Sequence, residues 1–367
     1  MKKVLALILA LSMVFVLVAC GGAEKAEEAP AAEAPAAEAP AAEAPAAEAP
    51  AAEAKGYKIG FSNFSIGNSW RQQMEAEFVY RAEQLVAEGV ISEYVMLMSD
   101  GDQAQQIDDI RSLVTQGCDA IIVSCITADG LNDVLEEAME EGVVVVTFDN
   151  NATTENITLR VAADDYAYGV QCGEWLAANV EDGAKIIVLD GTAGTLNNEN
   201  RHNGMLDAFT AASPNSEILA TVNADWDYAT AKVAVEELLA AHPQIDGVLS
   251  QGGAMTQAAL DAFVAAGRDL VPMTSEASNG FLKAWVKNME NGYSSMAFVN
   301  PPYFSSIALD KTIEALDGAT FDSIDYVVTF ESITDETAAE FVREDLSDAF
   351  WVNTYLPEET LTELFGE

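Results

Sequence analysis

Short apolar runs alternate with longer amphipathic stretches from residue 57 to residue 330. Continuous apolar runs of this length are typical of strands buried on both faces, and apolar positions three or four residues apart are typical of helices. We expect strands at residues 57–62, 94–98, 120–124, 143–148, 157–162, 184–189, 218–222, 247–250, 271–275, 294–299 and 326–330. Helical patterns lie between them, at residues 70–88, 104–116, 131–141, 166–180, 228–241, 255–266 and 303–316.

This alternation of strands and helices indicates an α/β fold whose parallel sheets are covered by helices on both faces. The expected strands are too many for one ordinary doubly wound sheet, so two sheets with a cleft between them are the simplest arrangement. Residues at the helix ends agree with this division. Asp102 and Asp129 stand at expected N-caps, and Gly142 and Gly267 directly follow expected helix ends.

Polar and aromatic side chains gather just after the expected strands, where open α/β sheets bind their ligands. The candidate binding residues are Asn68, Trp70, Arg71, Asp149, Asn150, Arg201, Trp226, Gln251, Glu276 and Asn300. Planar amide, carboxylate and guanidinium groups bond neighbouring hydroxyls in pairs, and an indole face covers the apolar face of a sugar ring. Each residue also has a simple structural alternative: Asp149 could be a turn residue, Arg201 an ion-pair partner and Trp226 the edge of a core. Their joint position at strand ends favours a binding cleft for a small neutral polyol.

The N-terminus has the pattern of an export signal. Lys2 and Lys3 precede an apolar run at residues 4–18, which is short for a bilayer span of roughly 20 residues. The ending Leu-Val-Ala-Cys20 resembles a bacterial lipobox, which implies that a signal peptide, residues 1–19, is removed and that Cys20 is lipidated. The alternative is an uncleaved helix with an incidental cysteine.

A low-complexity segment follows the cysteine and is built on the repeat Ala-Ala-Glu-Ala-Pro. Its regularly spaced prolines interrupt any helix, and its glutamates repel one another. We therefore expect residues 20–55 to be an extended tether behind a lipid anchor. This organisation predicts an extracytoplasmic protein, anchored by lipid to the outer face of the cell membrane and without a later membrane-spanning segment.

Charge narrows the possible partners. The chain has 60 acidic and 17 basic residues, with a formal net charge of −43. Such a surface repels phosphate backbones and anionic lipid headgroups, so we expect no nucleic-acid partner. It also means that the lipid, and not electrostatic attraction, would hold the protein at a membrane.

The remaining cysteines indicate neither a disulfide framework nor a metal site. Cys118 and Cys125 flank the strand expected at 120–124, which holds them roughly 20 Å apart. A disulfide needs Cα atoms about 4.4–6.8 Å apart. Together with Cys172, which lies in a helical pattern, they are predicted to be buried thiols, and we expect no metal and no cofactor.

The order and spacing of these segments resemble the ribose/galactose-type (type I) periplasmic sugar-binding proteins of ABC importers. The similarity runs from about residue 58 to residue 330, and Gly-Asn68-Ser-Trp70-Arg71 is among the motifs that carry it. The other stretches are residues 59–62, 146–149, 193–204, 224–227, 242–248 and 274–283.

That resemblance implies two Rossmann-like lobes, joined by a hinge of three crossovers near residues 163–164, 300 and 331, with the ligand cleft between them. The N-terminal lobe would comprise residues 56–163 and 301–331. The C-terminal lobe and a tail would comprise residues 164–300 and 332–367, with the tail packed on a lobe surface.

The same resemblance implies capture of a monosaccharide, either a pentose, a hexose or a related small polyol, and its delivery to the transmembrane subunits of an ABC permease. The chain has no Walker A sequence, so a separate ATPase subunit would handle ATP. Three departures leave the sugar open. Gly252 stands where relatives place a side-chain amide, so Gln251 or a water would serve instead; Glu276 stands where a shorter Asp is common, and Arg71 where an aromatic residue is common.

Two other functions remain as alternatives. A sensor lipoprotein with this fold would present a sugar, nucleoside or furanosyl signal to a membrane receptor, and its sequence would look the same. An enzyme is disfavoured, because the chain has no nucleotide-binding, nucleophile-elbow or zinc-protease motif. His202 and His242 are the available imidazole bases. A carboxylate pair such as Asp149 and Glu276 could also do acid–base work. We expect a binding protein without catalysis, and we expect it to be a monomer.

Overall fold

The computed structural model describes residues 56–367. The expected signal peptide at residues 1–19, the lipidated Cys20 and the tether up to residue 55 lie outside the described residues. Within the part that the structure describes, no helix is both long and apolar enough to cross a membrane.

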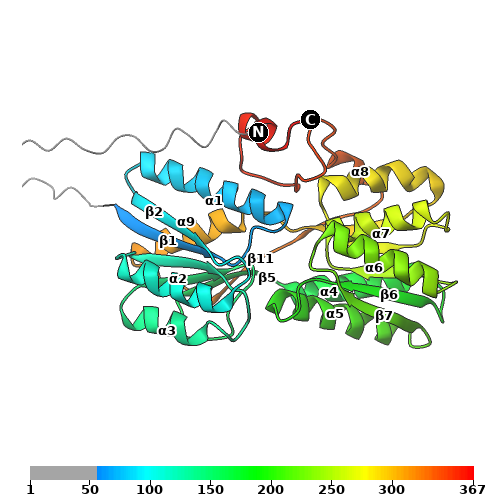
Figure 1. The fold of residues 1–367 in the computed structure, drawn as a ribbon, viewed down its shortest axis with the longest axis horizontal. Coiled ribbons are helices and arrows are strands. Elements are labelled where there is room, and N and C mark those ends of the chain that lie inside the picture. The colour runs from blue at the N-terminus through cyan, green and yellow to red at the C-terminus, as the bar shows by residue number, and fades with distance from the viewer. Residues whose placement is uncertain (1–55) are drawn as a thin grey trace, which may run out of the picture. The chain divides into compact units, whose positions relative to one another are not determined.

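The first sheet has six parallel strands in the order β11, β5, β4, β3, β1, β2 (Figure 1). The strands are β1 (Tyr57–Asn63), β2 (Ile91–Met98), β3 (Ala120–Ser124), β4 (Val144–Phe148), β5 (Leu159–Ala163) and β11 (Asp325–Val328). On one face, α1 (Ser69–Ala87) and α9 (Phe304–Leu316) bury Phe78 and Phe304 against Phe61. On the other face, α2 (Gln103–Thr115) and α3 (Asn132–Glu140) bury Ile110 and Val134. We call this sheet and its helices the N-terminal lobe.

The second sheet also has six strands, in the order β12, β10, β9, β8, β6, β7, and only β12 is antiparallel. They are β6 (Lys185–Asp190), β7 (Glu217–Asn223), β8 (Gly247–Ser250), β9 (Met273–Glu276), β10 (Ser295–Val299) and β12 (Glu331–Ile333). α4 (Asp165–Asn179) and α5 (Leu196–Ala212) cover one face. α6 (Tyr228–Ala241), α7 (Gly253–Ala265) and α8 (Asn279–Asn288) cover the other, where the short helix η1 (Met289–Asn291) follows α8. We call this sheet and its helices the C-terminal lobe.

The predicted α/β fold with two helix-covered sheets is confirmed, and each expected strand is present. The chain passes from one sheet to the other after β5, after β10 and between β11 and β12. The expected N-cap at Asp129 is wrong: α3 is preceded by Leu131, which makes no side-chain cap, and the Asp129 carboxylate accepts a hydrogen bond from Thr153. Asp102 does cap α2, with its Oδ1 2.8 Å from the amide of Ala104.

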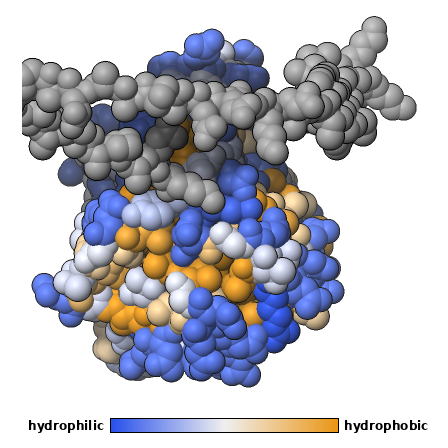
Figure 2. Space-filling model, turned by 90° about the vertical axis from the view of Figure 1, so that its left-hand side faces the viewer, coloured by the Kyte–Doolittle hydropathy of each residue, from blue (hydrophilic) through white to orange (hydrophobic). Residues whose placement is uncertain are grey.

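The surface of the N-terminal lobe combines apolar and charged positions. Figure 2 shows apolar residues at the centre of one face and hydrophilic residues around them. A groove between α2 and α3 is lined by Ile110 and Val134, and Arg111 Nη2 lies 3.0 Å from Glu137 Oε2 at its rim. This groove shares no lining residue with the cavity described below.

The tail, residues 334–367, contacts both lobes. It contains the short helices η2 (Ala338–Glu340) and α10 (Glu358–Phe365) and lies between α1 and α8 in Figure 1. Phe350 and Phe365 pack in the core of the C-terminal lobe, whereas Trp351 packs with the core of the N-terminal lobe. The sequence predicts a tail that is grouped with the C-terminal lobe and packs on the surface of one lobe, whereas the tail packs against the cores of both.

Candidate ligand-binding site

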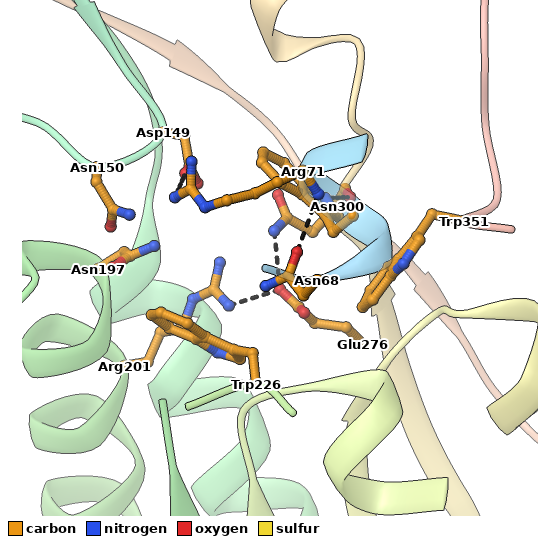
Figure 3. Close-up of a pocket in the computed structure, with 11 residues that line it drawn as sticks. Asn68, Arg71, Asp149, Asn150, Asn197, Arg201, Trp226, Glu276, Asn300 and Trp351 are labelled. Carbon is orange, nitrogen blue, oxygen red and sulfur yellow. Dashed lines mark hydrogen bonds and ion pairs between the residues drawn. The ribbon is translucent and has the colours of Figure 1, made fainter. Parts of the chain in front are cut away.

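A cavity of about 30 Å³ lies at the carboxyl ends of both sheets and is drawn in Figure 3. Its lining residues are Asn68, Trp70, Arg71, Asp149, Asn150, Asn197, Arg201, Trp226, Glu276, Asn300 and Trp351. The structure therefore brings together all the candidate binding residues except Gln251. Residues of both lobes and of the tail form its wall.

Arg71 is fixed in place from several directions. Its backbone amide donates to the N-cap Asn68, whose Oδ1 lies 2.9 Å away. Its guanidinium donates to Asn63 Oδ1 at 2.9 Å and to Asp149 Oδ2 at 3.0 Å, and it lies 3.8 Å from the ring centre of Phe64. Asp149 has a φ of +55°, an uncommon conformation for a residue with a side chain, which turns its carboxylate toward this cation.

Arg201 lies between two carboxylates of the C-terminal lobe. Its Nε donates to Asp165 Oδ1 at 2.7 Å, and its Nη1 donates to Glu276 Oε1 at 2.5 Å. Asn300 also donates to Glu276 Oε1, at 2.8 Å. Gly169 lets α4 approach α5 closely here, since a Cβ at this position would lie 2.3 Å from the carbonyl oxygen of Arg201. The two carboxylates and the close packing of α4 on α5 therefore fix the position of the Arg201 side chain.

The charged groups at the cavity wall form pairs of opposite sign. Burial raises the pKa of Asp149 although Arg71 opposes it, and burial raises the pKa of Glu276 although Arg201 opposes it. Burial disfavours the charge of Arg201, but Asp165 and Glu276 outweigh it and raise the pKa of the guanidinium. Because each lining cation already has a carboxylate partner, the cavity offers no free charge to an ionic ligand.

Trp226 is positioned by two glycines and by its own backbone. A Cβ on Gly191 would lie 2.1 Å from Cε2 and Cζ2 of the indole, and a Cβ on Gly252 would lie 2.7 Å from its Cδ1. Asp225 and Trp226 have φ values of +54° and +52°, so consecutive residues adopt the left-handed conformation. Backbone strain of this kind is common at sites where a side chain is positioned for a function. It also explains why Gly252 carries no side-chain amide: the indole occupies the space.

Several residues that line the cavity have polar side-chain atoms without partners. Within residues 56–367, Asn150 Nδ2 and Oδ1, Trp226 Nε1 and Asn300 Oδ1 are buried and make no hydrogen bond with the protein. Burying such atoms without a partner costs about 1–3 kcal/mol each. Two of them donate and two accept, and a hydroxyl group can both donate and accept. The set is therefore complementary to a molecule with several hydroxyl groups.

Gln251 lies behind the wall and does not line the cavity. Its Nε2 donates to Asp190 Oδ1 at 2.8 Å and to the carbonyl oxygen of Asn198 at 3.2 Å. Its backbone carbonyl accepts from Arg201 Nη1 at 3.3 Å. The residue therefore supports Arg201 and the loop after β6, where the sequence had suggested a direct substitute for the missing side chain at Gly252.

Two lining residues were not predicted. Asn197 lies in the first turn of α5, in an asparagine-rich segment from which the sequence analysis singled out Arg201 and His202. Trp351 lies in the tail, where no strand end marks it as a cleft residue. Asn197 could have been found from its place after β6, whereas Trp351 could not.

The chain is similar to known proteins. The family model for the periplasmic binding protein domain matches residues 59–320. The ribose import binding protein of Escherichia coli is 29% identical over 174 residues, which is 47% of this chain and 58% of that protein. The xylitol-binding protein of Mycolicibacterium smegmatis is 31% identical over 182 residues, which is 49% of this chain and 52% of that protein. The chain thus matches little more than half the length of these relatives.

Solved structures extend the likeness to nearly the whole described region. The periplasmic binding protein component of the arabinose ABC transporter from Shewanella sp. ANA-3 superposes with a TM-score of 0.69 at 24% identity. The match covers 77% of this chain and 93% of that one. At this identity the likeness shows the fold, in which two α/β lobes flank a cleft.

Proposed function

Because the chain belongs to the family of periplasmic binding protein domains, we propose that it is an extracytoplasmic solute-binding protein that captures a small neutral sugar or polyol between its lobes. The observation that carries this proposal is that Asn150, Trp226 and Asn300, which line the cavity, each have buried polar side-chain atoms without a partner in the described residues. Binding of hydroxyl groups would offset the cost of burying these atoms.

The paired charges favour a neutral ligand over a sugar phosphate or a sugar acid. Arg71 and Arg201 are both engaged by carboxylates, so an anionic ligand would have to displace Asp149 or Glu276. The indole of Trp226 adds an apolar surface that suits the C–H face of a pentose or hexose ring. Relatives named for ribose and xylitol have ligands of this class.

Entry of such a ligand requires the lobes to separate. Residues of both lobes line the cavity, so a ligand bound there would be enclosed from two sides. The segments after β5, after β10 and between β11 and β12 would serve as the hinge. Ligand contacts from both lobes favour closure, and an ABC permease with its own ATPase would recognise the closed form and accept the sugar.

Anchoring at a membrane is part of the same proposal. Removal of residues 1–19 and lipidation of Cys20 would place the acidic domain outside the cell, at the end of a tether formed by residues 20–55. The binding role needs no catalysis: Asp149 and Glu276 are occupied by arginines, and the known relatives are binding proteins.

Calorimetry on the purified full-length chain tests the proposal. D-ribose, xylitol, D-galactose and D-fructose serve as neutral probes, and ribose 5-phosphate and D-galacturonate as charged ones. We expect 1:1 binding of at least one neutral probe, no binding of the charged ones, and loss of binding in Asp149→Ala and Arg201→Ala. Arg111→Ala in the surface groove is the control and should bind normally. Absence of heat with every neutral probe would reject the sugar assignment.

A further inference from the structure

The tail supplies one wall of the candidate cavity. The family match ends at residue 320, and Trp351 follows it by a long stretch of chain, yet Trp351 faces the cavity beside residues of both lobes (Figure 3). We propose that Trp351 is a specificity-determining residue, which sets the size of ligand that the cavity accepts, and that Gln73 is its positioning residue. This inference rests on the proposed function, since it assumes that the ligand binds in this cavity.

Gln73 fixes the backbone of Trp351 by two hydrogen bonds. Its Nε2 donates to the carbonyl oxygen of Trp351 at 3.0 Å, and the amide of Trp351 donates to Gln73 Oε1 at 2.9 Å. Gln73 lies in α1 and is completely buried. On the opposite side, Trp351 forms an isolated antiparallel bridge with Ser278, just before α8. The residue is therefore held from both lobes at once.

The indole of Trp351 acts by shape and not by hydrogen bonding. Its Nε1 donates to Ser69 Oγ at 2.9 Å, so its polar group is already satisfied. Trp226 differs, because its Nε1 has no partner within residues 56–367. Trp351 thus offers a ligand only apolar ring surface, which limits the space beyond the polar groups that bond the hydroxyls. Its removal should enlarge the cavity without removing any of those polar groups.

The rest of the tail has its own anchors, so a change at Trp351 need not detach it. Asn279 Nδ2 donates to the carbonyl oxygens of Arg343 and Leu346 at 2.8 and 2.9 Å. Glu77 Oε2 of α1 accepts from the amide of Tyr355 at 3.2 Å. These bonds lie on either side of Trp351 in the sequence and hold the tail to each lobe.

The test compares dissociation constants for five-carbon probes, D-ribose and xylitol, with those for six-carbon probes, D-galactose and D-fructose. The variants are Trp351→Ala, Trp351→Phe and Gln73→Ala in the full-length chain. Trp175→Phe, at a partly buried indole of α4 that does not line the cavity, is the matched control. Thermal melting of each variant verifies folding. Trp351→Phe, which keeps an aromatic ring, carries the test if Trp351→Ala does not fold.

We expect Trp351→Ala to raise the dissociation constant for the five-carbon probes, relative to that for the six-carbon probes, at least 10-fold. The larger sugars would then bind relatively better. Trp351→Phe and Gln73→Ala should shift the ratio in the same direction by a smaller factor, and the control should leave it unchanged. An equal loss of affinity for every probe, or no loss for any probe, would show that Trp351 is structural. Either result would overturn this inference and leave the proposed function standing. If the unmodified protein binds no probe, the proposed function fails and this inference fails with it.

Discussion

The indole Nε1 of Trp70 donates a 2.8 Å hydrogen bond to the backbone carbonyl oxygen of Asn300. Trp70 lies in the first turn of α1 in the N-terminal lobe, and Asn300 directly follows β10, where the chain leaves the sheet of the C-terminal lobe. The side chain of Asn300 in turn donates to Glu276. One line of hydrogen bonds therefore joins the first candidate binding loop, the crossover and the carboxylate that holds Arg201.

Replacing Trp70 by Phe should destabilise the protein. The change keeps a ring in the core but leaves the buried carbonyl of Asn300 without its donor, which costs about 1–3 kcal/mol of unfolding free energy. Urea unfolding followed by circular dichroism measures the loss. Trp175→Phe, at a partly buried indole outside the cavity, should change the unfolding midpoint less. Equal losses in the two variants would contradict a role for the crossover bond.

Removing the cation at position 201 should be far more costly. In Arg201→Met, Asp165 and Glu276 stay buried without their partner, which is expected to lower the unfolding free energy by about 3–5 kcal/mol. Adding Glu276→Gln to this variant should restore part of the loss, because one of the two uncompensated carboxylates is then gone. The exposed pair of Arg111 and Glu137 provides the control, and Arg111→Ala should leave the urea midpoint nearly unchanged. A loss in Arg201→Met as small as in the control would contradict the prediction.

Asn150→Ala should separate binding from stability. Both polar atoms of the Asn150 side chain are buried and unpartnered within the described residues, so their removal should leave the unfolding free energy unchanged or higher. The same removal deletes hydrogen bonds to the ligand's hydroxyl groups and should weaken binding of the best neutral probe about 10-fold or more. Calorimetry and urea unfolding of the same preparation test both parts. Lower stability with unchanged affinity would show that Asn150 is structural.

The fold follows from the sequence because its strands are buried on both faces. Every residue of β3 is buried, so its continuous apolar run has one simple interpretation. β12 was missed because it has only three residues, of which Glu331 and Ser332 are exposed. The N-cap expected at Asp129 is wrong because a carboxylate can cap a helix only if its oxygens are available to the helix amides. The Asp129 carboxylate accepts a hydrogen bond from Thr153 instead.

Site residues that directly follow a strand could be predicted from the sequence. Residues placed by contacts between segments far apart in the sequence could not. Arg71 and Asp149 follow β1 and β4, and parallel strands bring such residues to one edge. Trp351 reaches the cavity through its bonds to Gln73, 278 residues away in the sequence. The direction of the Gln251 side chain could not be predicted either, because it depends on a hydrogen bond from its amide to Asp190.

The pH dependence of stability should report the excess of carboxylates around Arg201. Asp165 and Glu276 share this one guanidinium, and burial raises the pKa of Glu276 above its ordinary value of 4.5. A carboxyl group with a raised pKa binds its proton more readily in the folded state. Its stabilising contribution is therefore complete below the unfolded pKa and is lost as the pH rises through the folded pKa.

Glu276→Gln removes this titration while Gln Oε1 can still accept from Arg201 and Asn300, as Glu276 Oε1 does. The unfolding free energy of the unmodified protein, minus that of the variant, should thus fall as the pH rises from 4.5 toward neutrality. Urea unfolding at pH 4, 5, 6, 7 and 8 measures this difference. Arg111→Ala, whose exposed pair is distant from the cleft, should show a difference that stays nearly constant over the same range. A difference for Glu276→Gln that rises with pH would mean that Arg201 stabilises the Glu276 carboxylate more than burial opposes it.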